Sequence, residues 1–234
     1  MSPTLGIASF AVGAATALLL MALAIAPFLT PQWVAFEQDR ADAAAWTGFT
    51  PADLRSATDA ILADLVLGPP DFDVAVNGAP VLSEAERSHM RDVRGVFAGF
   101  YAAATVGLVV VIAGRVAARA SSAWTRIRFW RAVRGGAVVT AAGIAVAGVI
   151  AAVAFDAAFE VFHRLFFATG TYNFDPRTAR LVQLFPDAFW SETSIAVGAV
   201  IFALGIATIA VATRRLRSAA DSGIVAGALS PVAR

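Results

Sequence analysis

Four long stretches without a charged residue constrain this sequence more than any other feature. They cover residues 5–28, 96–113, 137–155 and 195–212 and are mostly apolar. Because a helix rises about 1.5 Å per residue, about 20 such residues cross the roughly 30 Å hydrocarbon core of a bilayer. With 59% hydrophobic residues and a mean hydropathy of +0.71, the composition is that of a multi-pass membrane protein. We therefore predict an all-α integral membrane protein, with four transmembrane helices in a single membrane domain.

The charged residues between these stretches are strongly segregated. Residues 114–134 hold six arginines and no acid, and residues 213–234 hold four arginines and one acid. Residues 30–95 hold eleven acids and five arginines, and residues 156–194 hold five acids and three arginines. The positive-inside rule then makes the 114–134 loop and both termini cytoplasmic. It leaves residues 30–95 as a small helical cap outside the membrane and residues 156–194 as an outer re-entrant or interfacial loop.

Missing residue types exclude several classes of site. There is no Cys, which excludes disulfides, thiolate metal sites and a cysteine nucleophile, and there is no Lys, which excludes a Walker A loop and a Schiff-base lysine. Nothing in the sequence indicates nucleic-acid binding. Ala24-Ile25-Ala26 resembles a signal cleavage site, but the apolar stretch is too long and Pro27 follows it. We predict an uncleaved first span.

Local motifs predict two helices in the outer cap. Thr50-Pro51-Ala52-Asp53 combines a capping residue, a proline at the first helical position and an acid, and the helix that it starts should end at Gly68-Pro69-Pro70. Asn77-Gly78 is typical of a hairpin turn. Ser83-Glu84-Ala85-Glu86 is a capping box, and the helix that it opens should continue into the second span.

Both histidines of the chain fall on the outer side in this topology. His163 follows Glu160 by three residues, and Asp92 follows His89 by three residues. Each pair shares one helical face, so the carboxylate is expected to accept an imidazole N–H and fix the tautomer. If the second and third spans are neighbours, the two pairs converge over one pocket.

Other interpretations of these residues compete with catalysis. Histidines near a membrane surface are often structural, and Glu160-Val161-Phe162-His163 has the Glu-x-x-His spacing of di-iron helical bundles. Because the sequence contains only one such motif, we predict no metal and no other cofactor. The arginines Arg91 and Arg164 are either interfacial anchors or partners of a phosphate or oxyanion. The aromatic side chains Phe162, Phe166 and Phe167 either face lipid or the core, or form a wall for acyl chains.

Two segments resemble a bacterial four-span membrane family. FHRLFFATGTYNFDPRTARLVQLFPDAFW, residues Phe162–Trp190, is similar to a family signature with FH-x-x-FF, an FDP element and a late P-x-x-F/W. HMRDVRGVF, residues His89–Phe97, is similar to the second family motif. The best characterised members are lipoprotein intramolecular transacylases. The tryptophan expected before FDP is replaced here by Tyr172-Asn173, and residues 177–180 lack an expected acid.

This resemblance implies acyl transfer at the outer leaflet of the bacterial cytoplasmic membrane. The implied reaction moves the sn-2 acyl chain of a diacylglyceryl lipoprotein to the α-amino group of its N-terminal Cys, with membrane phospholipids around it. The resemblance makes His89 and His163 catalytic, and we expect support from Asp92, Glu160, Arg164, Arg91, Tyr172 and Asp175. An ester-to-amide transfer needs a base and an acid, and two imidazoles with a pKa of about 6.5 can supply both. The alternatives are a non-enzymatic lipid-binding or accessory protein, or a metal-dependent lipid-modifying enzyme.

Overall fold

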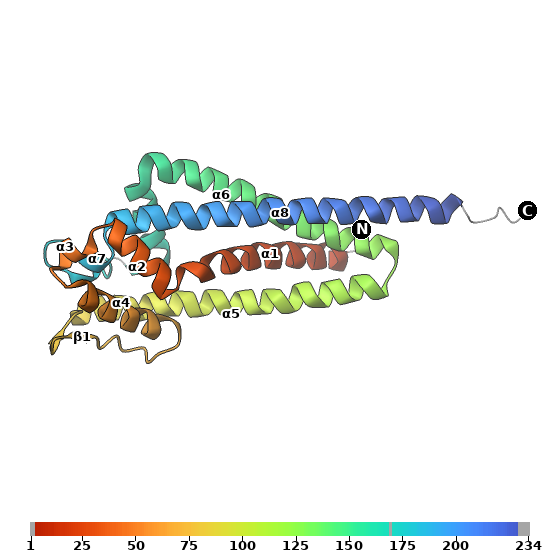
Figure 1. The fold of residues 1–234 in the computed structure, drawn as a ribbon. Coiled ribbons are helices and arrows are strands. Elements are labelled where there is room, and N and C mark those ends of the chain that lie inside the picture. The colour runs from red at the N-terminus through yellow and green to blue at the C-terminus, as the bar shows by residue number, and fades with distance from the viewer. Residues whose placement is uncertain (1–2, 169, 229–234) are drawn as a thin grey trace, which may run out of the picture. The chain divides into compact units, whose positions relative to one another are not determined.

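The computed structural model describes residues 3–168 and 170–228 and is almost entirely helical (Figure 1). Four helices are long and apolar enough to cross a membrane, which confirms the predicted all-α fold with four candidate spans. In chain order the elements are α1 (Pro3–Ile25), the 3₁₀ turn η1 (Ala26–Phe28), α2 (Pro31–Arg40), α3 (Ala43–Thr47), α4 (Pro51–Val66), β1 (Ala75–Val76), β2 (Ala79–Pro80), α5 (Glu84–Ala120), α6 (Ala123–Phe166), α7 (Arg180–Leu184) and α8 (Asp187–Ala228).

Three of the candidate spanning helices, α5, α6 and α8, are longer than the apolar stretches that predict them. Helix α5 has 37 residues, which corresponds to about 55 Å. The segment 114–134, which the sequence presents as a loop, is helical except at Ser121 and Ser122. The segment 156–194 likewise begins inside α6 and ends inside α8. The polar residues next to the apolar stretches therefore extend these helices instead of ending them, because they do not break a helix.

The chain folds into two compact units, where the sequence predicts one domain. Unit 1 comprises residues Met1–Ala24, Tyr101–Val146 and Ala199–Arg234. Unit 2 comprises Ile25–Phe100 and Ala147–Gly198. Both histidines and all of the predicted supporting residues belong to unit 2.

Small residues hold the helices of unit 1 together. A Cβ added to Gly136 of α6 would lie 2.2 Å from the backbone oxygen of Gly13 in α1, so only glycine allows this approach. Gly107 of α5 similarly lies against Ala15 of α1. Helices that cross a membrane have no hydrophobic drive toward each other, and close backbone packing replaces it.

Unit 2 has a core of its own. Its buried apolar side chains come from α3, α4, the hairpin, α5 and α7: Ala43, Leu54, Ala57, Ile61, Phe72, Val74, Val81, Leu82, Met90, Leu181 and Leu184. The predicted hairpin is present, with Ala75 paired to Pro80 and Val76 to Ala79 around a turn at Asn77. The predicted helix start at Thr50 is also confirmed, since its hydroxyl accepts the Asp53 backbone N–H. Helices α2 and α3 have no counterpart in the prediction, which places only two helices in this segment.

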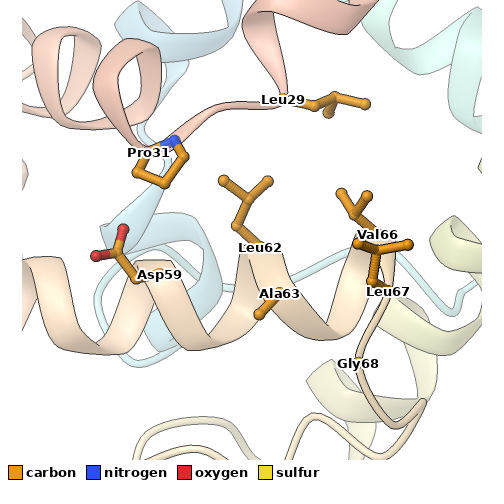
Figure 2. Close-up of a pocket in the computed structure, with 8 residues that line it drawn as sticks. All are labelled: Leu29, Pro31, Asp59, Leu62, Ala63, Val66, Leu67 and Gly68. Atoms are coloured by element: carbon orange, nitrogen blue, oxygen red, sulfur yellow. The ribbon is translucent and has the colours of Figure 1, made fainter.

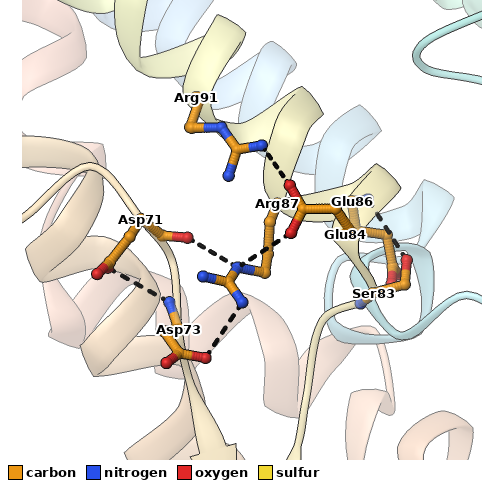
Figure 3. A network of polar contacts seen from close by, with 7 residues as sticks. All are labelled: Asp71, Asp73, Ser83, Glu84, Glu86, Arg87 and Arg91. Atoms are coloured by element: carbon orange, nitrogen blue, oxygen red, sulfur yellow. Dashed lines mark hydrogen bonds and ion pairs between the residues drawn. The ribbon is translucent and has the colours of Figure 1, made fainter.

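A polar network fixes the start of α5 (Figure 3). The capping box forms as predicted: the Ser83 backbone N–H donates to Glu86 over 2.7 Å, and the Glu86 N–H donates to the Ser83 hydroxyl. Arg87 donates to the Asp71 carbonyl and to the Asp73 carboxylate, which ties the hairpin to this helix. The first turns of α5 are therefore held from two sides.

Helix α6 is interrupted near its C-terminal end. Ala154 has a non-helical backbone conformation, with φ −153° and ψ 54°. The interruption separates the long apolar part of the helix from its last turns, residues 155–166. Those last turns carry Glu160 and His163.

Candidate active site

The last turns of α6 position His163. Its imidazole is buried, with 8% of its surface exposed. Nδ1 lies 2.8 Å from the backbone oxygen of Phe159, one turn earlier in the helix. A carbonyl oxygen only accepts hydrogen bonds, so Nδ1 carries the proton and Nε2 carries the lone pair. His163 therefore presents a basic nitrogen away from its own helix.

His89 lies beside this ring, on the second turn of α5. Only 6% of its surface is exposed. The centroids of the two imidazole rings are 6.1 Å apart, and the ring planes differ by 24°. The convergence of the two histidines, which the sequence allows only if their spans are neighbours, is therefore present.

Aromatic side chains enclose the histidine pair. Phe167 contacts both rings, with centroid distances of 4.9 Å to His89 and 5.5 Å to His163. Phe174 packs edge-on against His89, and Tyr172 packs against His163 at 5.0 Å. The pair consequently lies in a poorly hydrated surround, where electrostatic interactions with a reacting group are stronger than in water.

Other aromatic contacts to His163 come from its own helix. The ring of Phe159 lies 4.1 Å from the imidazole and that of Phe162 lies 5.4 Å from it. Phe162 and Phe166 are about half exposed, whereas Phe167 is buried. Of the three predicted wall residues, Phe162 and Phe167 thus contact a histidine, and Phe166 stacks on Phe162 at 4.9 Å.

The predicted imidazole–carboxylate pair at His163 is wrong. Glu160 accepts hydrogen bonds from Arg164 Nε over 2.7 Å and from the Tyr172 hydroxyl over 3.4 Å. The Nδ1–H of His163 instead donates to the carbonyl oxygen of Phe159, one turn earlier in the same helix. Glu160 orients Tyr172, which in turn packs on the imidazole, so the carboxylate supports the histidine indirectly.

The second predicted pair is also not formed. Nδ1 of His89 is buried and has no hydrogen-bond partner among the residues that the structure describes. Asp92 does not supply one, although it lies within one helical turn. The buried nitrogen of His89 is therefore left available for a bound molecule.

Two further predicted supporting residues have other partners. Arg91 donates to Glu84 over 2.6 Å. Asp175 is bound through both carboxylate oxygens by Arg177, and these hydrogen bonds lower the pKa of Asp175 below its usual value. Neither residue contacts a histidine ring.

Two contacts are absent from the sequence-based prediction. The first is the hydrogen bond of His163 to the Phe159 carbonyl; helical spacing could have revealed it, because Phe159 lies four residues before His163. The other is made by Glu86, whose second oxygen accepts the backbone N–H of Leu181 over 2.7 Å. No local pattern connects residues 95 positions apart.

An apolar groove of about 430 Å³ lies elsewhere in unit 2, between the start of α2 and the end of α4 (Figure 2). Leu62 and Val66 of α4 face it, together with Leu29 from the connection before α2. Asp59 is its charged residue. The groove contains none of the predicted site residues.

Possible metal-ligating side chains do not gather in the part of the chain that the structure describes. Within residues 3–168 and 170–228, no group of three or more His, Cys, Asp or Glu side chains is placed to hold an ion. Glu160 and His163 also point to different partners, so the Glu-x-x-His spacing does not form a shared ligand pair.

Comparison with known proteins decides the family. A family model described as lipoprotein intramolecular transacylase Lit matches residues 10–190, more than three quarters of the chain. This chain belongs to the Lit family. Lit proteins are transacylases, and thus transferases that act on lipoproteins. A search of proteins with curated annotation found no match.

Solved Lit structures have the same fold. The membrane-integral Lit from Bacillus cereus superposes with a TM-score of 0.75 at 18% identity, covering 93% of this chain and 98% of that one. Two variants of that protein, with one histidine replaced by arginine or by alanine, give TM-scores of 0.71 and 0.70 at 17% identity. They cover 94% and 92% of this chain, and 95% and 94% of theirs. At this identity the likeness concerns the fold, and it agrees with the four candidate spans.

Proposed function

We propose that this protein moves the sn-2 acyl chain of a diacylglyceryl lipoprotein to the α-amino group of its N-terminal Cys. The observation that supports this proposal most is the pair of buried imidazoles, 6.1 Å apart, in a chain of the Lit family. A lipoprotein carrying both ester and amine brings the two reacting groups together, and holding them in place supplies much of the rate acceleration.

His163 is the general base in this proposal. Its Nε2 removes a proton from the α-amine as the amine nitrogen attacks the ester carbonyl carbon. The new C–N bond forms, and the carbonyl oxygen becomes an oxyanion. The bond between that carbon and the sn-2 oxygen then breaks, and the oxygen takes up a proton to become a hydroxyl. The products are an N-acyl amide and a lyso-glyceryl group.

His89 completes the proton transfer. The proton that His163 takes from the amine passes to His89, whose buried Nδ1 has no hydrogen-bond partner among the described residues, and from His89 to the leaving glycerol oxygen, so both rings end neutral. The aromatic side chains around the pair exclude water, which would otherwise divert the acyl group to hydrolysis. Arg164 is the better candidate than Arg91 to stabilise the oxyanion, since its partner Glu160 also binds the Tyr172 hydroxyl and Tyr172 packs on His163.

Replacement of either histidine tests this assignment. His163→Ala and His89→Ala are each expected to reduce N-acyl product by roughly 10²–10⁴-fold. The assay expresses each variant in a host without its own lipoprotein N-acylation and analyses lipoprotein N-terminal peptides by mass spectrometry. Leu165→Ala is the matched control, because Leu165 is 74% exposed on the same turn of α6.

The possible results separate activity from mechanism. Wild-type protein that never yields an N-acyl, lyso-glyceryl cysteine would overturn the proposed reaction. Wild-type product from both alanine variants would overturn the roles of the histidines. Tyr172→Phe keeps the ring on His163 but loses the hydroxyl bound to Glu160, so it is expected to cost less activity than either histidine change.

We further propose that the protein lies in the bacterial cytoplasmic membrane with both termini inside and the histidine pair outside. The arginine-rich connection between α5 and α6 supports this orientation. Because the chain has no cysteine, single-cysteine variants report topology directly. Asn77→Cys should react with an impermeant maleimide in intact cells, and Ser122→Cys should react only after lysis. The reverse pattern would refute the orientation.

A further inference from the structure

Unit 1 carries an unusual excess of positive charge. Its sequence contains ten arginines and a single acid, Asp221. Unit 2, in contrast, contains eight arginines and sixteen acids. The seven ion pairs that the structure describes all lie in unit 2. Unit 1 therefore carries a large net positive charge in its sequence.

Three of these arginines form a cluster, which we call the arginine triad: Arg115 and Arg119 of α5 and Arg215 of α8. Arg115 is half-buried, and its strongest charged neighbours are the other two members, which repel it. Its guanidinium lies 5.7 Å from the centre of the Trp130 ring of α6. Arg119 and Arg215 are exposed. Ala118 of α5 and Ala212 of α8 belong to one buried cluster against which Trp130 packs, so like charges from the two helices meet at this end of unit 1.

The arginine triad lies at the edge of the hydrocarbon region. Arg115 follows the apolar stretch 96–113 by two residues, and Arg215 follows the stretch 195–212 by three. At about 1.5 Å per residue, both Cα atoms lie within about 5 Å of the end of these stretches. Lipid phosphates lie at this depth, and tryptophan is enriched in the same layer.

We propose that the arginine triad is a binding site for the headgroup of an anionic phospholipid. Guanidinium groups bind phosphate oxygens through two parallel N–H donors, which a lysine cannot do. A phosphate diester between Arg115 and Arg215 relieves the repulsion among the three guanidinium groups. Its acyl chains then lie in the bilayer beside α5 and α8. This site is separate from the histidine pair and does not depend on the proposed acyl transfer.

Native mass spectrometry of the full-length protein in detergent tests the site, with phosphatidylglycerol and phosphatidylcholine as probes. Arg115→Gln, Arg119→Gln and Arg215→Gln are combined in one variant. Each arginine contributes a factor of somewhat less than about tenfold to the affinity for an anionic lipid. The triple change is therefore expected to weaken phosphatidylglycerol binding by about 100-fold. The matched control removes the same charge from the same unit: Arg126→Gln, Arg131→Gln and Arg134→Gln. The control is expected to bind like the wild type.

Each outcome decides the proposal. Equal losses in the two triple variants would show diffuse attraction only and would overturn the site. Equal binding of the two lipids by the wild type would overturn the requirement for a negative headgroup. Inorganic phosphate that binds as tightly as phosphatidylglycerol would assign the arginines to a soluble anion instead. If the triple variant does not fold, the single variant Arg215→Gln is compared with the wild type instead, because this side chain is exposed.

Discussion

Glu86 links the start of α5 to the segment around α7, and its removal should be costly. The side chain is 3% exposed, and its two oxygens accept the backbone N–H groups of Ser83 and Leu181, each over 2.7 Å. Glu86→Ala leaves the buried Leu181 N–H without a partner. A hydrogen bond to a charged group contributes about 1.5–3 kcal/mol, so the loss of both is worth about 3–6 kcal/mol. For a chain of this size, that corresponds to a fall in Tm of roughly 6–24 °C.

Thermal unfolding in detergent, followed by intrinsic tryptophan fluorescence, measures this effect. Glu84→Ala is the matched control, because Glu84 is two residues away but its side chain is 73% exposed and pairs only with arginines. Its loss should cost less than about 1 kcal/mol. Glu86→Gln keeps one acceptor oxygen and should fall between the two. Equal Tm values for Glu86→Ala and Glu84→Ala would refute the buried tie.

Two further substitutions test other parts of the fold. Burial and the neighbouring Glu192 carboxylate raise the pKa of Glu37 above its usual 4.5, so its charged form destabilises the native state. At pH values above that raised pKa, Glu37→Gln should raise Tm, and the gain should vanish below about pH 4.5; a gain independent of pH would contradict this. Gly136→Ala should lower stability by about 1–3 kcal/mol or more because its Cβ meets the Gly13 backbone. Gly143→Ala is the control and should not lower Tm, because a Cβ at Gly143 meets no atom within 4 Å. Equal Tm values for the Gly136→Ala and Gly143→Ala variants would exclude the close approach of Gly136 to Gly13.

The sequence predicts the membrane fold well because the relevant signals are local and strong. Uninterrupted apolarity over 18 or more residues leaves few alternatives to a spanning helix. The capping motifs at Thr50 and Ser83 were also recognised, since each depends on residues within one turn. The break in α6 at Ala154 could not be predicted, because neither glycine nor proline marks it.

The site could be predicted only in part, because partner choice is a tertiary property. The histidines were identified, but their hydrogen bonds were not. Spacing places Glu160 within reach of His163, yet it cannot reveal that Arg164 and Tyr172 compete for the same carboxylate. The contact of Phe174 with His89 likewise depends on how a loop returns to the start of α5.

The order of synthesis gives the histidine pair one more property. His89 emerges from the ribosome 74 residues before His163, and Phe174 follows later still. Two membrane insertions, those of α5 and α6, must be finished before the rings can meet. A nascent chain that exposes only its first two spans therefore carries one unenclosed imidazole and no pair. The pair on which the proposed acyl transfer rests therefore forms only after α6 and Phe174 have been synthesised.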